Sequence, residues 1–128
     1  MPFEFKEYDR GIFVRYFGFV PPSDFFESRV AIRALPNHDK FEYALCDFSD
    51  MDADCIWSMT REMADSVGER DADVPSNQDG FRKMAMVAQN QKVLELLEYY
   101  VGHYQSAPNA EYRLFRSVQQ AWAWIGDP

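Results

Sequence analysis

The feature that most limits how this chain can fold is the regular alternation of strand-like and helix-like segments. Residues 3–8 alternate apolar and charged side chains, and residues 12–20 are rich in β-branched and aromatic residues, as strands are. The turn sequence at residues 9–11 joins the two into a hairpin. Every later strand-like segment is followed by a helix-like one. This alternation builds parallel strand pairs with right-handed crossovers, and it predicts an α/β fold of order ββαβαβαβα.

The first helix is predicted over residues 24–35, after the segment Pro21-Pro22-Ser23 and before Pro36-Asn37. Its apolar stripe at helical spacing consists of Phe26, Val30 and Ala34. Phe25 and Ile32 are seven residues apart and lie on a different side of the helix. A helix that is apolar on two sides either sits deep or meets a second surface.

The next crossover begins with the nearly continuous apolar run at residues 43–48, which is typical of a central strand buried on both faces. A helix is predicted over residues 55–67, because Ile56, Met59, Met63 and Val67 repeat with a helical period. Gly68 is well placed to cap that helix. The polar residues 69–80 are predicted to form a long loop.

The last two strands are predicted at residues 81–89 and 112–116. The first is followed by a helix that begins after Asn90, and the second by a helix that begins after Ser117. Asn90 and Ser117 are the expected N-caps, and Gln120 completes a capping-box pattern with Ser117. The inward stripe of the first of these helices is Val93, Leu96, Leu97, Tyr100 and Tyr104, opposite a polar stripe of Gln91, Glu95, Glu98 and Gly102. The last helix points Val118, Ala121, Trp122 and Ile125 inward, and Trp124, about 200° away at 100° per residue, should face outward.

Composition narrows the class of protein. The 128 residues fit a single domain spanning 1–128, and the 47% apolar content is enough for a sizeable core. A net charge of −8 disfavours binding to nucleic acid and to anionic membrane surfaces. Two cysteines are too few for a disulfide scaffold, and neither a signal peptide nor an integral membrane segment is apparent, so we expect a cytoplasmic protein.

The aspartate-rich segment CDFSDMDADC (46–55) raises a metal-site hypothesis. Asp50, Asp52 and Asp54 have the spacing of the first three ligands of a calcium loop. Such a loop needs a glycine and a glutamate where this chain has Cys55 and Arg61, so we expect no metal. Asp52 or Asp54 instead caps the helix that follows, where a carboxylate gains about 0.3–1 kcal/mol from the helix dipole.

No catalytic or cofactor-binding motif is present, so we expect neither enzymatic activity nor a cofactor. Cys46 lies in the predicted central strand and is expected to be a small buried hydrophobic residue. Cys55, at a predicted helix start, is the only candidate nucleophile.

The chain resembles the STAS fold and, more closely, the uncharacterised SpoIIAA-like bacterial proteins, which are also compared with Sec14-type lipid-binding domains. The resemblance is carried by GIFVRYFGFV, YALCDFSDMD, KMAMVAQ and YRLFRSVQQAWAWI. It implies a mixed, mostly parallel five-stranded sheet with an N-terminal hairpin and four helices. In STAS anti-sigma-factor antagonists, a serine after an aspartate at a helix start is phosphorylated. Here Cys55 follows Asp54, so phosphorylation of Ser49 or Ser58 would need a shifted alignment.

Two functions follow from these observations. The first is a non-catalytic interaction module that binds a protein partner or itself. Its candidate docking loop consists of Ser49, Asp50, Asp52, Asp54, Cys55 and Ser58, and its candidate interface residues are Phe25, Ile32, Trp57 and Trp124. The alternative is a Sec14-like carrier of a small apolar, lipid-like ligand in an aromatic-lined pocket. The candidate pocket residues are Met59, Met63, Tyr100 and Tyr104, and a fully packed core would argue against this alternative.

Overall fold

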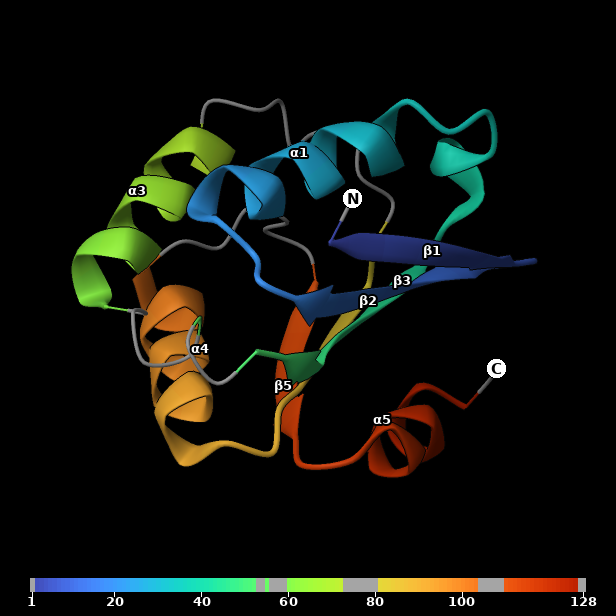
Figure 1. The fold of residues 1–128 in the computed structure, drawn as a ribbon. Coiled ribbons are helices and arrows are strands. Elements are labelled where there is room, and N and C mark those ends of the chain that lie inside the picture. Colours follow the sequence, from blue (N-terminus) through green and yellow to red (C-terminus); the bar gives the residue numbers. More distant parts are fainter. Residues whose placement is uncertain (1, 53–54, 56–59, 73–80, 104–109, 127–128) are drawn as a thin grey trace.

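The computed structural model describes residues 2–52, 55, 60–72, 81–103 and 110–126, which build a five-stranded sheet flanked by helices (Figure 1). In chain order the elements are β1 (Phe3–Tyr8), β2 (Gly11–Gly18), α1 (Pro22–Arg33), the 3₁₀ helix η1 (His38–Lys40), β3 (Tyr43–Met51), α3 (Arg61–Ala72), β4 (Lys83–Val87), α4 (Gln91–His103), β5 (Glu111–Phe115) and α5 (Val118–Ile125). The predicted order ββαβαβαβα is confirmed.

The strands lie in the order β1-β2-β3-β4-β5, antiparallel between β1 and β2 and parallel from β2 onward. Tyr8 pairs with Gly11 across the tight turn, which confirms the predicted hairpin. Gly11 is buried against Tyr43 of the neighbouring strand, and a Cβ at Gly11 would overlap the Tyr43 ring. The close approach of β3 to the start of β2 therefore requires glycine at this position.

The strand order determines which face each helix covers. Strands β2 to β5 follow one another across the sheet in one direction, and right-handed crossovers in a constant direction place every crossover helix on the same face. Helices α1, α3 and α4 accordingly lie together on one side of the sheet, whereas α5 lies on the opposite side (Figure 1). Helix α5 packs on β3, β4 and β5.

The two central strands β3 and β4 send alternate side chains to two hydrophobic clusters. The cluster on the side of the three crossover helices takes Ala44, Phe48, Met84 and Met86 from these strands. The cluster under α5 takes Tyr43, Leu45, Ala85 and Val87. Burial on both faces explains why residues 43–48 are almost continuously apolar.

The regular apolar stripe of α1, which includes Val30 and Ala34, does not face the sheet. Val30 is 45% exposed and Ala34 is also exposed. Ile32 and Ser28 are buried, and Phe25 packs against the same cluster. The second apolar side, predicted as a candidate outer surface, is in fact the inward side. The polar Ser28 interrupts the apolar pattern of this side, although hydrogen bonds allow its hydroxyl to be buried.

The aspartate-rich segment continues β3 further than predicted. Strand β3 pairs with β2 as far as Met51, so Asp47 and Asp50 belong to the strand. The strict alternation of burial is lost here, because the register between β2 and β3 shifts between Arg15 and Phe17: Phe48 and Met51 are buried and Asp50 is exposed. The prediction that the strand ends at residue 48 is wrong, because pairing with the long β2 sustains it.

The helix predicted over residues 55–67 is interrupted at Thr60 and extends beyond its predicted end. Cys55 is helical, but Thr60 is not, and α3 runs from Arg61 to Ala72. Gly68 therefore lies inside α3 and does not end it, and residues 69–72, predicted to be in a loop, are helical. Gly68 was predicted to end the helix, but a glycine inside a helix costs only about 1 kcal/mol relative to alanine. Tertiary packing can offset this cost, so the helix continues beyond Gly68.

The caps of the last two helices are as predicted. Asn90 Oδ1 accepts a hydrogen bond from the Lys92 N–H at 2.9 Å, and Ser117 Oγ accepts one from the Gln120 N–H at 3.1 Å. The apolar stripe of α5 faces the sheet, where Ala121 and Ile125 are buried. The described residues of the α4 stripes also lie as predicted: Val93 and Leu97 are buried and Leu96 and Tyr100 half-buried, whereas Gln91, Glu95, Glu98 and Gly102 are exposed.

Trp124 departs from its predicted outward orientation. Its ring is half-buried, 5.6 Å from the ring of Phe115, and the cations of Lys83 and Arg113 lie over it at 5.1 and 5.4 Å. Lys83 Nζ also donates a hydrogen bond to the Trp124 carbonyl. A helix lying on a sheet contacts it along its flanks as well, and an indole is long enough to reach the neighbouring strands from there.

Candidate functional site

A cavity of about 140 Å³ lies between the sheet and the helices α1, α3 and α4. Helix α3 packs mainly against α1 and α4, and it lies over the space between them. It contributes only the small side chain of Ala64 to the described lining, after Thr60 at its N-terminal end. Among the lining residues that the structure describes, α3 therefore places no large apolar side chain in the space beneath it.

The walls of the cavity are mostly apolar. The aromatic lining residues are Tyr16, Phe25, Phe48, Phe81 and Tyr100, and the aliphatic and thioether ones include Ile32, Leu96, Leu97, Met84 and Met86. Tyr16 and Phe48 stack with their centroids 4.9 Å apart, and Phe25 packs against both rings. Thr60 is exposed and Tyr100 is half-buried, so the cavity reaches the protein surface.

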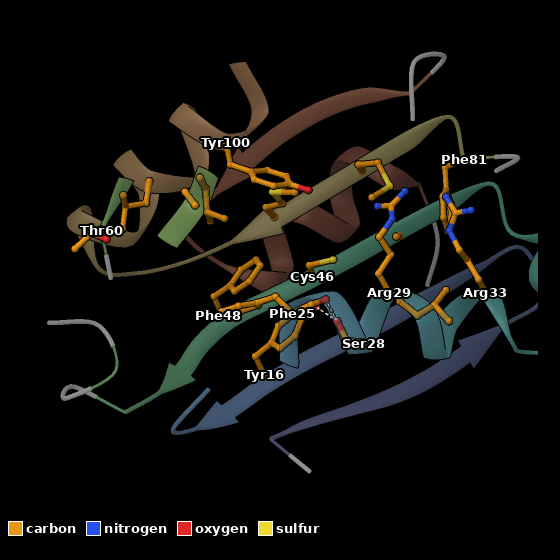
Figure 2. Close-up of a pocket in the computed structure, with 17 residues that line it drawn as sticks. Tyr16, Phe25, Ser28, Arg29, Arg33, Cys46, Phe48, Thr60, Phe81 and Tyr100 are labelled. Carbon is orange, nitrogen blue, oxygen red and sulfur yellow. Dashed lines mark hydrogen bonds between the residues drawn. The ribbon is translucent and has the colours of Figure 1, made fainter. Parts of the chain in front are cut away.

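One wall contains a short chain of buried hydroxyl groups. Ser28 Oγ donates to the Phe25 carbonyl at 2.7 Å, and the Tyr16 hydroxyl lies 2.6 Å from Ser28 Oγ (Figure 2). Because the Ser28 hydrogen is used toward Phe25, the Tyr16 hydroxyl is the donor to Ser28. The chain joins β2 to α1 and positions the aromatic wall.

The other end of the cavity is cationic. Arg29 and Arg33, one turn apart on α1, both line it, and the Nε atom of each is sealed from solvent. Figure 2 shows both guanidinium groups toward the end of the cavity where Phe81 lies, with Phe48 and Thr60 toward the opposite end. The cavity therefore combines an aromatic end with a positively charged end.

The structure describes only some of the residues predicted to line a pocket. Tyr100 lies in the cavity wall. Met59 and Tyr104 lie outside the described residues, and so does the side chain of Met63, whose backbone is in α3. Most of the wall was not predicted. Two sequence features could have indicated the wall. One is the side of α1 on which Phe25, Ile32 and two arginines share a face, and the other is the set of alternate residues along β3 and β4.

The predicted interface residues do not form one described surface. Phe25 and Ile32 line the cavity, and Trp124 is held under two cations on the other side of the sheet. Trp57 lies outside the described residues.

The predicted docking loop is partly exposed. Asp50 and Asp52 are exposed, and Arg15 donates hydrogen bonds to Asp50 at 2.7 Å and to Glu4 at 2.9 Å. These two carboxylates raise the pKa of Arg15, first through the hydrogen bond to Asp50. Ser49 is half-buried, and its N–H donates to the carboxylate of Asp47. Asp54 and Ser58 lie outside the described residues.

The two cysteines also differ from their predicted roles. Cys55 is only 1% exposed, and its thiol donates to the Val20 carbonyl at 3.2 Å. In this conformation the buried sulfur is not presented to a partner or a substrate. Cys46 is half-buried in the cavity wall instead of fully packed. Within the described part of the chain, no three His, Cys, Asp or Glu side chains gather as a metal site would require.

A polar contact holds α3 against α4. The Tyr99 hydroxyl donates to Asp65 at 2.7 Å, and the Arg61 guanidinium lies 5.2 Å from the Tyr99 ring centroid. The hydrogen bond to Asp65 is the main cause that raises the pKa of Tyr99, because it favours the protonated phenol. This contact fixes one side of the helix that covers the cavity.

The fold and the site define a class of protein: an α/β sheet protein with a small apolar cavity under three helices and two arginines at one end of it. The SpoIIAA-like family profile matches residues 12–126, and the chain belongs to this family. Among solved structures, the chain is similar to an uncharacterised protein of the DUF3478 family with a SpoIIAA-like fold from Shewanella loihica PV-4. The two share 13% identity over 96% of this chain and 91% of that one, with a TM-score of 0.54, which shows a common fold.

No curated protein matches this chain. Among the helices that the structure describes, none combines the length and hydropathy needed to cross a bilayer.

Proposed function

We propose that this protein is a non-catalytic carrier that binds one small apolar ligand in the cavity between α1, α3, α4 and the sheet. The observation that supports this function is the cavity itself, about 140 Å³ of space with an aromatic and aliphatic wall. A fully packed core would have argued for the interaction module instead.

The size of the cavity limits the ligand. An apolar cavity of about 150 Å³ holds benzene or xenon, whereas pockets for drug-sized ligands are about 300–1,000 Å³. The present cavity therefore fits one aromatic ring or a short branched chain. A lipid with two acyl chains, as the Sec14 comparison would suggest, is too large for it in this conformation.

The experiment is a titration of the ¹⁵N-labelled protein with benzene, followed by amide chemical shifts. Benzene is expected to shift amides of α1, β3 and α4 that border the cavity and to raise the melting temperature. In the variant Ala64→Leu the added side chain fills the space under α3, so benzene binding should be lost. Ala123→Leu makes the same change at an exposed position of α5 and should leave benzene binding intact.

If benzene leaves the wild-type protein unchanged, the cavity is not a ligand site and the proposal fails. Binding that is equal in both leucine variants would place the ligand elsewhere on the protein. Circular dichroism of both variants controls for their folding.

A second function, docking of a protein partner or of another copy of this chain, is favoured by one surface feature. Phe19 is 57% exposed directly after β2, and the exposed Asp52 donates its N–H to the Gly18 carbonyl beside it. An exposed aromatic next to acidic side chains suits a partner with apolar and basic groups. Light scattering of wild type and Phe19→Ser tests self-association, and a wild-type monomer at high concentration would exclude the homodimer.

A further inference from the structure

We propose that the ligand of the cavity is a small monocarboxylate, with one aromatic ring or a short branched chain, whose carboxylate is bound by Arg29 and Arg33. This inference rests on the proposed carrier function and adds the charge and the orientation of the ligand. It is supported by the placement of two cations in a cavity whose other walls are mainly apolar.

The geometry of α1 brings the two arginines to one place. Residues i and i+4 lie on the same face of a helix, and this is the spacing of Arg29 and Arg33. Both side chains are half-buried and line the cavity, and both guanidinium groups lie near Phe81 (Figure 2). The stacked rings of Tyr16 and Phe48 form the apolar part of the wall. A bound acid would therefore place its carboxylate toward the arginines and its apolar part toward these rings.

Electrostatics favours an anion here despite the charge of the whole protein. The net charge of −8 repels anions at long range, but charges more than about 8–10 Å apart are largely screened at physiological ionic strength. The two arginines act at contact distance and are half-buried in a mostly apolar cavity wall, where charge–charge attraction is stronger than in bulk water. We therefore expect the two arginines, and not the net charge of the protein, to act on a ligand at this end of the cavity.

The chemistry of the guanidinium selects a carboxylate. Its planar N–H fork matches the two oxygens of a carboxylate, and such charge-assisted pairs are about twice as strong as neutral hydrogen bonds. The cavity volume leaves room for about one ring beside it. A free inorganic anion would leave the aromatic wall unused, so an amphipathic acid uses both ends of the cavity.

The experiment compares benzoate with benzamide, a neutral ligand of nearly the same shape, by calorimetric titration and amide chemical shifts. Wild-type protein is expected to bind benzoate at least about tenfold more tightly, because a hydrogen bond to a charged group contributes about 1.5 kcal/mol or more. In the double variant Arg29→Gln/Arg33→Gln this preference should fall to about twofold or less, with benzamide affinity unchanged. Arg10→Gln removes one positive charge at an exposed site outside the cavity and should keep the preference.

The outcomes separate this inference from the function on which it rests. If benzamide or benzene binds as tightly as benzoate, the arginines do not select an anion and the inference is overturned, although the carrier function stands. If none of the three binds, the carrier function fails as well. The wild-type comparison decides between these outcomes even if the double variant does not fold. A preference that survives in a folded double variant would also refute the role of the arginines.

Discussion

Replacing Ser28 by alanine is expected to destabilise the protein more than replacing Tyr16 by phenylalanine, although both changes remove the same hydrogen bond. Tyr16 is 5% exposed and Ser28 1%, with 2.6 Å between their hydroxyl oxygens. Tyr16→Phe leaves Ser28 donating to the Phe25 carbonyl, so it should cost about 1 kcal/mol, the net value of one hydrogen bond. Ser28→Ala takes the acceptor away from a buried phenol and should cost about 1–3 kcal/mol.

The assay is urea unfolding of wild type, both single variants and the double variant, followed by circular dichroism. The double variant should cost less than the sum of the single ones, because Tyr16→Phe removes the hydroxyl that Ser28→Ala would leave buried. A loss of 1 kcal/mol corresponds to about 4 °C in melting temperature for a domain near this size. Equal costs that add without coupling would refute the donor assignment and the importance of the buried pair.

The remaining predictions concern one glycine and one helix contact. Gly11→Ala should destabilise the protein by about 1–3 kcal/mol in thermal melts, because the added Cβ would overlap the Tyr43 ring. Gly102→Ala, which has open space around it in α4, should stabilise the protein by up to about 1 kcal/mol in the same melts. The reverse order of stabilities would contradict the packing around Gly11. The raised pKa of Tyr99 means that its contact with Asp65 stabilises fully below pH about 10 and is lost as the pH rises through the folded pKa. Unfolding of Tyr99→Phe and wild type should therefore differ less at pH 11 than at pH 8, and a pH-independent difference would refute the contact.

The strand and helix order could be predicted because several independent signals agree in each segment. Asn90 and Ser117 begin helices where capping rules place them, and the residues between alternate or repeat with one clear period. The handedness rule then limits how the segments connect. The order of strands in the sheet was not predicted, since periodicity does not say which strands are neighbours.

The orientation of α1 could not be predicted, for a specific physical reason. The apolar stripe that includes Val30 is regular, yet the side that includes Ser28 is buried. A sequence pattern counts serine as polar, whereas the fold satisfies its hydroxyl with two hydrogen bonds and then buries it. The arginines of the cavity were missed with it, because charged residues are usually assigned to the solvated side of a helix.

The cavity itself follows from the difference between the two sides of the sheet. On one side, α5 is short and apolar, and Trp122 fills the space between it and the strands by packing against Tyr43 and Phe13. On the other side, the constant direction of the crossovers places α1, α3 and α4 on the same face of the sheet. Helix α3 lies between the other two and has the least apolar sequence of the three. Of the described side chains of α3, the small Ala64 borders the cavity. Where a covering helix borders an apolar sheet face with a small side chain, space remains between the two layers, and the described lining under α3 has this arrangement at Ala64.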